Sequence, residues 1–144
     1  MQARPCVLIA AQPGAWAILR AMLEDVFDLV PAHSTSDALQ ILDSQSASIA
    51  AIVSTIAFDD SRMMEFLHAA KSRPNVSAIP FICSRVLPTV LSDDAVARVA
   101  EVCRLAGAVD FIDIPGLDER SAPIVLKAVL QRHIESAPGA TPAA

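Results

Sequence analysis

Residues 49–54 read Ile-Ala-Ala-Ile-Val-Ser, a run that is apolar up to its last residue. A strand that is covered on both faces is apolar at consecutive positions, whereas a strand with one wet face alternates. The stretch therefore predicts a central strand of a parallel sheet with helices on both sides. Outward from it, short apolar runs alternate with longer segments of helical spacing, which is typical of repeated strand–helix units.

Five such units follow one another, so the sequence predicts an α/β fold with a five-stranded, doubly wound parallel sheet. The predicted strands are residues 6–10, 28–32, 49–54, 79–83 and 109–113. The second strand contains Pro31, which cannot donate a backbone hydrogen bond and therefore favours an edge of the sheet.

The helix boundaries are marked by residues that start or stop helices. Pro13 suits a first helical turn and is expected to open the first helix. Ser34 and Ser92 are expected to cap the second and fourth helices, because a serine hydroxyl accepts hydrogen bonds from free backbone amides. A helix over about residues 61–71 should follow the third strand, and the last helix should begin near Ser121.

The 144 residues suffice for one domain with a sizeable core, which we expect to cover residues 1–135. The Ala-, Pro- and Gly-rich residues 136–144 are expected to form a disordered tail. The formal net charge is −5, and no segment gathers enough Arg or Lys to follow a phosphate backbone. We therefore expect no nucleic-acid partner.

The possible metal-ligating residues are scattered. The chain has three cysteines and three histidines: Cys6, Cys83, Cys103, His33, His68 and His133. Their spacing matches no zinc site, so we expect buried reduced thiols, surface histidines, and neither a metal nor another cofactor. The sequence also shows no apolar run near the roughly 20 residues of a transmembrane helix and no signal-peptide pattern. We expect a cytoplasmic protein without a membrane partner.

Several strings, taken in their order along the chain, resemble the receiver domain of bacterial response regulators. Residues 7–13 (VLIAAQP) resemble the first strand and loop of that family, and residues 106–112 (AGAVDFI), with Pro115 after them, resemble its entry to the fifth strand. Residues 79–82 (IPFI) are similar to its fourth strand, and residues 65–67 (EFL) to its third helix. The resemblance covers nearly the whole ordered chain and implies a flavodoxin-like (βα)5 fold with strand order 2-1-3-4-5.

The family's phosphorylation site maps onto residues that cannot perform its chemistry. In receivers two carboxylates after the first strand hold Mg²⁺, and their positions fall on Ala10 and Ala11, whose methyl groups supply no oxygen ligand. The aspartate that accepts phosphate falls on Thr55, whose hydroxyl cannot form an acyl phosphate. We therefore expect no metal at this site, no phosphorylation on aspartate and no enzymatic activity.

The other site positions also depart from the family pattern. The Thr or Ser at the end of the fourth strand falls on Arg85 if the segment is read without a gap, or on Ser84 if one residue is dropped; the ungapped alignment is preferred. The lysine position falls on Ile114, which removes the cation that would bind a phosphoryl oxygen. Phe111 takes the aromatic switch position.

Two aspartates after the third strand offer an alternative acceptor. A slipped register would place Asp59 at the acceptor position, although Ala10 and Ala11 would still leave Mg²⁺ unsupported. We favour a structural role, in which Asp59 and Asp60 cap the helix that follows.

Without a phosphorylation site, the surface becomes the place to look for function. The candidate interface residues are Trp16, Leu87, Val90, Leu91, Val102 and Leu105. Trp16 lies beside the buried stripe of its helix, where it either anchors an interface or is partly buried against a loop. The apolar loop 86–91 either binds a partner or, as we favour, folds back over the emptied pocket. Receivers commonly use the fourth helix, fifth strand and fifth helix for contacts, and we expect Val102 and Leu105 on that face.

These observations predict an atypical, phosphorylation-independent receiver-like module of two-component or phosphorelay signalling. Its partner would be a signalling kinase, an effector or a second copy of the chain. The alternative is a small-molecule or anion binder that uses the crevice near Thr55, Ser84 and Arg85. A thiol enzyme built on Cys83 is a third hypothesis, but the sequence supplies no evident base or orienting acid for it.

Overall fold

A computed structural model shows one parallel sheet and describes residues 4–137. The sheet contains β1 (Cys6–Ala10), β2 (Asp28–Ala32), β3 (Ala51–Thr55), β4 (Phe81–Arg85) and β5 (Asp110–Asp113). Their order is β2-β1-β3-β4-β5, and all four neighbouring pairs are parallel. The predicted doubly wound sheet and its strand order are confirmed, and Pro31 lies on an edge strand as expected.

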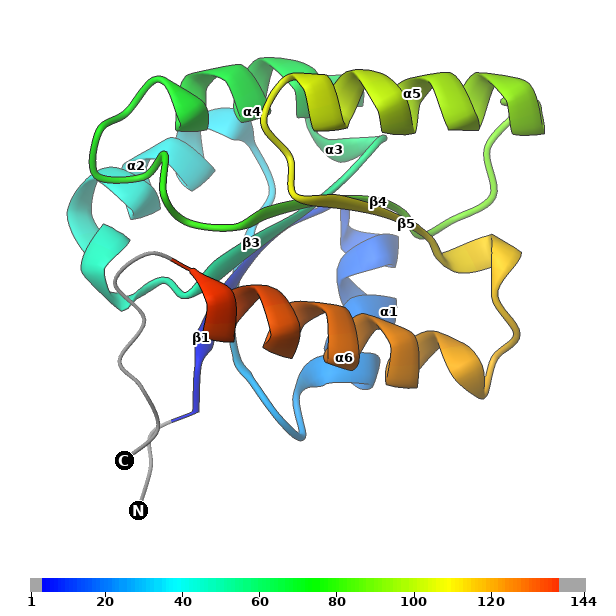
Figure 1. Cartoon of the computed structure of the whole chain (residues 1–144), viewed down its shortest axis with the longest axis horizontal. Coiled ribbons are helices and arrows are strands. Elements are labelled where there is room, and N and C mark those ends of the chain that lie inside the picture. The colour runs from blue at the N-terminus through cyan, green and yellow to red at the C-terminus, as the bar shows by residue number, and fades with distance from the viewer. Residues whose placement is uncertain (1–3, 138–144) are drawn as a thin grey trace.

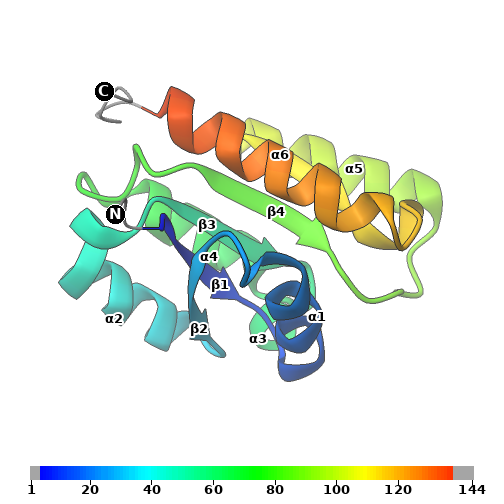
Figure 2. The ribbon, with the colours of Figure 1, turned by 90° about the horizontal axis from the view of Figure 1, so that it is seen from below.

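Helices cover both faces of the sheet (Figure 1). One face is covered by α2 (Thr35–Gln45), the short α3 (Phe58–Ser61), α4 (Met63–Lys71) and α5 (Asp93–Leu105). The other face is covered by α1 (Pro13–Leu23) and α6 (Ser121–Ser136), which lie toward the viewer in Figure 2. Two short 3-10 turns, η1 (Ser46–Ser48) and η2 (Ile114–Gly116), complete the regular structure.

Each face of the sheet has its own buried cluster. Ile52 and Phe81 belong to the cluster beneath α2, α4 and α5, whereas Val53 and Ile82 belong to the cluster beneath α1 and α6. Successive side chains of a strand point to opposite faces, so β3 needs apolar residues at both. This two-sided burial explains why residues 49–54 are almost wholly apolar.

The fourth strand lies two residues later than predicted. Pro80 has no backbone N–H to donate to a strand ladder, and the amide of Ile79 already donates to the carbonyl of Val76 in a turn. The regular strand therefore begins at Phe81 and ends at Arg85. The third strand likewise ends at Thr55, one residue later than predicted.

Most predicted helix ends are confirmed. The hydroxyl of Ser34 accepts from the amide of Asp37 at 3.0 Å, and that of Ser92 accepts from the amide of Ala95 at 3.2 Å. The last helix begins at Ser121 as predicted, but it still includes Ser136, where the tail was expected to start. Residues 138–144 of that tail lie outside the described residues.

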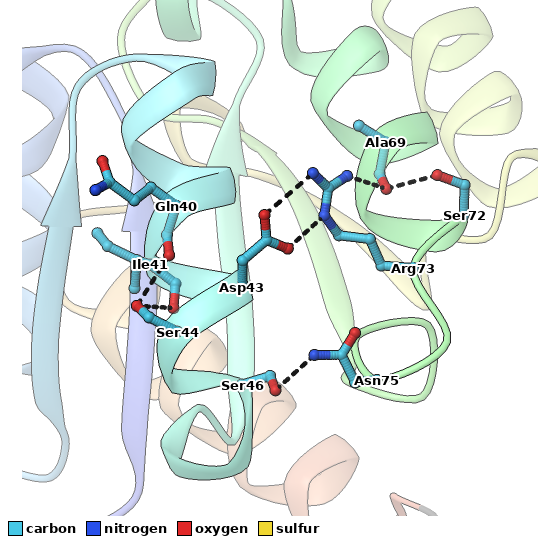
Figure 3. A network of polar contacts seen from close by, with 9 residues as sticks. All are labelled: Gln40, Ile41, Asp43, Ser44, Ser46, Ala69, Ser72, Arg73 and Asn75. Carbon is cyan, nitrogen blue, oxygen red and sulfur yellow. Dashed lines mark hydrogen bonds and ion pairs between the residues drawn. The ribbon is translucent and has the colours of Figure 1, made fainter.

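A surface network joins the end of α2 to the segment after α4 (Figure 3). Arg73 donates to both carboxylate oxygens of Asp43, at 2.7 and 3.4 Å, and Asn75 donates to the hydroxyl of Ser46 at 2.9 Å. Within residues 4–137, no helix combines the length and the apolar character that crossing a membrane requires.

Candidate functional site

The carboxyl ends of the strands meet at one edge of the sheet, which is where ligands bind in open α/β folds. Ala10 ends β1 and Ala11 follows it, Thr55 ends β3, Arg85 ends β4, and Asp113 ends β5. The register sets Arg85 directly beside Asp113. The structure therefore brings the predicted site positions together at this edge.

A charged pair occupies the β4–β5 side of the edge. Arg85 donates from Nε to Oδ1 of Asp113 at 2.8 Å and from Nη2 to Oδ2 at 2.9 Å. Its Nη1 donates to the hydroxyl of Thr89 at 3.3 Å. The hydrogen bonds to Asp113 raise the pKa of Arg85 above its ordinary value, so the guanidinium stays charged. Its charge is therefore neutralised within the protein.

Asp113 was not singled out from the sequence, although a signal for it was present. The predicted order 2-1-3-4-5 makes the fourth and fifth strands neighbours, and the two strands end in Arg85 and Asp113. An arginine and a carboxylate at adjacent strand ends are in reach of a bidentate pair.

Two hydroxyls lie near the centre of the edge, and both donate to neutral oxygens. Thr55 donates to Oε1 of Gln12 at 2.7 Å, and Ser84 donates to the backbone carbonyl of Ser54 at 3.1 Å. A hydroxyl becomes a nucleophile when an adjacent base takes its proton, and an amide or peptide carbonyl is not such a base. Neither hydroxyl is arranged for covalent chemistry.

The residues at this edge do not fit the Mg²⁺ ion that the receiver resemblance implies. Ala10 and Ala11 are fully buried and carry only methyl groups, whereas Mg²⁺ requires oxygen ligands in a near-octahedral arrangement. Two carboxylates that end or follow strands of the sheet already have partners: Asp113 is held by Arg85 and Asp59 by a backbone amide.

Asp59 caps a different helix from the one predicted. Its Oδ2 accepts from the amide of Thr35 in the first turn of α2 at 2.9 Å, which lowers the pKa of Asp59. Asp59, Asp60 and Ser61 have φ values of 49°, 55° and 64°, so they form a left-handed turn at about 1 kcal/mol of strain per residue. The prediction that Asp59 and Asp60 cap the following helix is wrong, because the N-cap of α4 is Arg62.

The loop 86–91 folds partly over the strand ends. Val86 is buried and Leu87 packs against Gly14 at the start of α1, as the favoured interpretation predicted. A cavity of about 150 Å³ remains beneath them. Its lining residues are Gln12, Thr55, Ile56, Ala57, Arg85, Val86, Leu87, Pro88 and Thr89. Val90, in contrast, projects fully into solvent.

The other candidate interface residues divide by exposure. Val102 and Leu105 are exposed, whereas Trp16 and Leu91 are half-buried against the two core clusters. For Trp16, this favours the interpretation of partial burial over that of a free anchor. Phe111 is buried in the core cluster beneath α5.

Val102 does not face the surface on which it was expected. It lines a groove between α4 and α5, together with Met64, Arg98 and Val99. Residues two positions apart on an α-helix point in nearly opposite directions, and it is Arg104 that reaches β5, at 3.6 Å from Asp110. The helical stripe that suggested one apolar face therefore places Val102 toward α4.

The face formed by α5, β5 and α6 instead carries a cluster of charges around Asp110. Its carboxylate lies 3.6 Å from Arg104 of α5, 3.4 Å from Arg132 of α6 and 3.6 Å from the Nε2 atom of His133. This cluster links the three elements at the amino end of β5.

The sequence matches no protein-family model and no curated protein. Solved structures are nevertheless similar over almost the whole chain. The receiver domain of a signal transduction histidine kinase from Syntrophus aciditrophicus has a TM-score of 0.72 at 20% identity, with 97% of each chain covered. A receiver domain protein from Clostridium thermocellum has a TM-score of 0.68 at 16% identity, covering 89% of this chain and 95% of that one.

A third similar structure is the receiver domain of a sensor histidine kinase from Pseudomonas aeruginosa, solved with a magnesium ion coordinated in its active-site cleft. Its TM-score is 0.67 at 20% identity, with 94% of this chain and all of that chain covered. At the matching edge of this chain lie the alanines and the Arg85–Asp113 pair described above. By its topology and by these likenesses, the chain has the receiver fold.

Proposed function

We propose that this chain is a receiver-like module of two-component or phosphorelay signalling that is not phosphorylated on aspartate and works through protein–protein contacts. The observation that carries the proposal is the composition of the strand-end edge on a receiver fold. The positions of phosphorylation chemistry hold Ala10, Ala11, Thr55, Arg85 and Ile114. None of these side chains can serve as an aspartyl acceptor, an Mg²⁺ carboxylate or a free lysine.

The Arg85–Asp113 pair gives a physical reason why no phosphoryl group is needed. The pair joins the ends of β4 and β5, and the bond from Arg85 to Thr89 adds the loop that leads to α5. Bidentate charge-assisted bonds are among the stronger polar contacts in proteins. The loop is thus held by an internal ion pair, and the module presents a constant surface to its partner.

Exposed apolar side chains around α5 support a contact role. Leu105 near the end of α5 is 81% exposed and Val109 just before β5 is exposed, while Val102, 50% exposed, lines the groove between α4 and α5. Large apolar side chains that stay exposed can mark an interaction surface. We propose that a kinase, an effector or a second copy of the chain binds here, with homodimer contacts across α5, β5 and α6. The module would act in the cytoplasm without catalysis of its own.

A titration tests the absence of phosphorylation directly. Backbone amide NMR spectra would be recorded with Mg²⁺, and then with Mg²⁺ and acetyl phosphate, with intact mass measured in parallel. We expect no saturable shifts at the strand ends and no added phosphoryl mass. The Pseudomonas aeruginosa receiver serves as the positive control for Mg²⁺ binding. Saturable, Mg²⁺-dependent labelling of this chain would overturn the proposal.

Sedimentation analysis tests the contact surface in the form of self-association. If α5 takes part in a homodimer, Leu105→Glu should shift the equilibrium toward monomer, because a charge would be desolvated at the interface. Ala97→Glu is the matched control, since Ala97 is exposed on the same helix. An equal effect of both variants would argue against a specific contact at Leu105.

The alternative, a small-molecule binder at the strand ends, has the cavity in its favour. At about 150 Å³ the cavity is smaller than the ~300–1,000 Å³ usual for ligand sites. Arg85 is neutralised by Asp113, so an anion gains little there, and Ser84 is turned away to Ser54. The cavity therefore suits only a small neutral ligand. Binding of such a fragment would shift the NMR signals of Gln12 and Thr55.

A further inference from the structure

Three sulfur atoms meet in the core beneath α5. The Sγ atom of Cys103 on α5 lies 3.6 Å from the Sδ atom of Met64 on α4. Cys83, which lies on β4, belongs to the same buried cluster as Cys103, and its interaction with Cys103 together with burial raises the pKa of the Cys83 thiol. Both cysteines are fully buried and Met64 is half-buried. Three different elements thus contribute sulfur to one place.

A buried hydroxyl without a partner lies beside this group. Ser54 of β3 is the register partner of Cys83, and partners in adjacent parallel strands project from the same face of the sheet. Ser54 is fully buried, and its hydroxyl lacks a hydrogen-bond partner among the residues that the structure describes. Such a hydroxyl is costly in the core unless it finds an acceptor, and a cysteine thiolate would be one.

A cation is also held close to the sulfur atoms. Lys71 donates to the carbonyls of Ser77 at 3.0 Å and Ile79 at 3.3 Å, and its ammonium opposes in part the rise in the pKa of Cys83. Its aliphatic stem packs over Gly107, where an added Cβ would meet Lys71 Cγ at 3.3 Å. Gly107 has a φ of +112° and leaves this space free.

We propose that Cys83, Cys103 and Met64 bind a soft monovalent metal ion of the Cu(I) class. Thiolate and thioether ligands favour Cu(I) over harder cations. On binding, each thiol loses its proton to solvent, and both thiolates and the thioether donate electron pairs to the metal. No electron is transferred, because the ion enters as Cu(I).

The ligand number distinguishes Cu(I) from Zn²⁺. Two thiolates and Cu(I) together carry one negative charge, which the nearby ammonium of Lys71 opposes. A Zn²⁺ ion in the same place would lack the fourth protein ligand of a structural zinc site. The Ser54 hydroxyl would then donate to the Cys83 sulfur and so gain its missing acceptor.

One sulfur–sulfur distance already fits such a site, and one ligand lines a groove that opens to solvent. With metal–sulfur bonds of about 2.3 Å, three sulfur atoms around one ion stand ~4 Å apart, close to the observed 3.6 Å between Cys103 and Met64. Met64 also lines the open groove between α4 and α5, so one ligand is reachable from solvent. This site is independent of the proposed signalling role.

Competitive titration of the full chain tests the site. Under anaerobic, reducing conditions, Cu(I) supplied as its acetonitrile complex would be titrated in the presence of bicinchoninate. We expect one Cu(I) per chain, with tight uptake lost in Cys83→Ala and Cys103→Ala and kept in Cys6→Ala, the matched thiol control. Met64→Leu should weaken binding roughly tenfold, the lower end of what losing a supporting group costs. An excess of Zn²⁺ should not displace the Cu(I).

NMR of the unmodified chain covers the case in which a core variant fails to fold. The methyl resonance of Met64 should move with one equivalent of Cu(I), whereas that of Met63, its neighbour, should stay in place. The proposal is overturned if the chain cannot compete with bicinchoninate, if Cys6→Ala alone abolishes uptake, if Zn²⁺ displaces the metal, or if the Met64 methyl does not respond.

Discussion

Two arginine–carboxylate pairs in this molecule have nearly the same chemistry and different surroundings. Arg85 and Asp113 are joined at 2.8 and 2.9 Å, with side chains 10% and 32% exposed. Arg73 and Asp43 are joined at 2.7 and 3.4 Å, with side chains 29% and 55% exposed (Figure 3). The first pair lies at the ends of β4 and β5, and the second links the surface of α2 to the segment after α4.

The difference shows how burial sets the role of an ion pair. In water, solvent competes for both charges, and an exposed pair adds little to stability. A largely buried pair is different, because removing one partner leaves the other charge uncompensated where solvent cannot replace it. The Arg85–Asp113 pair therefore acts as a structural element of the strand-end edge, whereas the Arg73–Asp43 pair is a surface contact.

The largest effect is expected from breaking the buried pair. Asp113→Asn keeps the shape of the side chain but leaves Arg85 charged without a counterion, which should lower the free energy of unfolding by about 3 kcal/mol. Urea unfolding followed by circular dichroism measures this. A loss no larger than that of the Arg73 variant below would show that solvent reaches Arg85 freely.

The next largest effect is expected from removing both charges of the buried pair, which tests whether the uncompensated charge causes the loss of stability. Replacing both partners, in Arg85→Met with Asp113→Leu, removes the buried charges together and should recover roughly 2 kcal/mol relative to Asp113→Asn. A double-mutant cycle with the two single variants gives the coupling energy. If the double variant is as unstable as the sum of the singles, the two side chains contribute independently and the pair is not a unit.

A smaller effect is expected at Asp59. Unlike Asp113 and Asp43, which are bound by arginines, Asp59 accepts a hydrogen bond from a backbone amide. Because the folded-state pKa of Asp59 is lowered, its contribution is fully present above the unfolded value of about 3.9 and is lost as the pH falls toward the folded value. Asp59→Asn should therefore be less stable than the wild type at neutral pH, and the two should converge in acid.

Asparagine is the suitable replacement at position 59, because it tolerates the left-handed backbone of this turn. Asp37→Asn provides the control, since Asp37 also lies in the first turn of α2 and is exposed. Parallel curves of stability against pH for Asp59→Asn and the wild type would contradict the capping role.

The smallest effect is expected from the exposed pair. Arg73→Ala should change the urea midpoint only slightly, and added salt should reduce even that difference, because screening weakens exposed charge pairs. A salt series of unfolding curves measures it. A loss comparable to that of Asp113→Asn would remove burial as the explanation of the contrast.

Local patterns in the sequence were enough for most of the fold. The apolar runs predicted the strands, Pro31 predicted an edge strand, and Ser34 and Ser92 predicted helix starts, because these features depend on the residue itself or on close neighbours. The strand order was implied by the resemblance to receivers. The two-residue shift of β4 follows from Pro80, whose missing backbone amide outweighs the apolar pattern around it. Residue type also led to the prediction that the strand-end positions lack phosphorylation chemistry.

Long-range contacts could not be predicted in the same way. Asp59 caps α2 from a left-handed turn, and no residue type in that turn predicts its conformation. Val102 points toward α4, because successive side chains of a helix are rotated by about 100°. A shift of one or two residues in the buried stripe of α5 therefore changes the face on which Val102 lies.

The sequence by itself determined that this chain forms a doubly wound parallel sheet and that its strand ends hold alanine, threonine and isoleucine where receivers carry reactive groups. Those properties reside in single residues and their periodic spacing. Only the tertiary structure decided that Arg85 is neutralised by Asp113 and that the sulfur atoms of Cys103 and Met64 lie 3.6 Å apart. These contacts join residues far apart in the chain, and packing of α4 and α5 on the sheet brings them within reach.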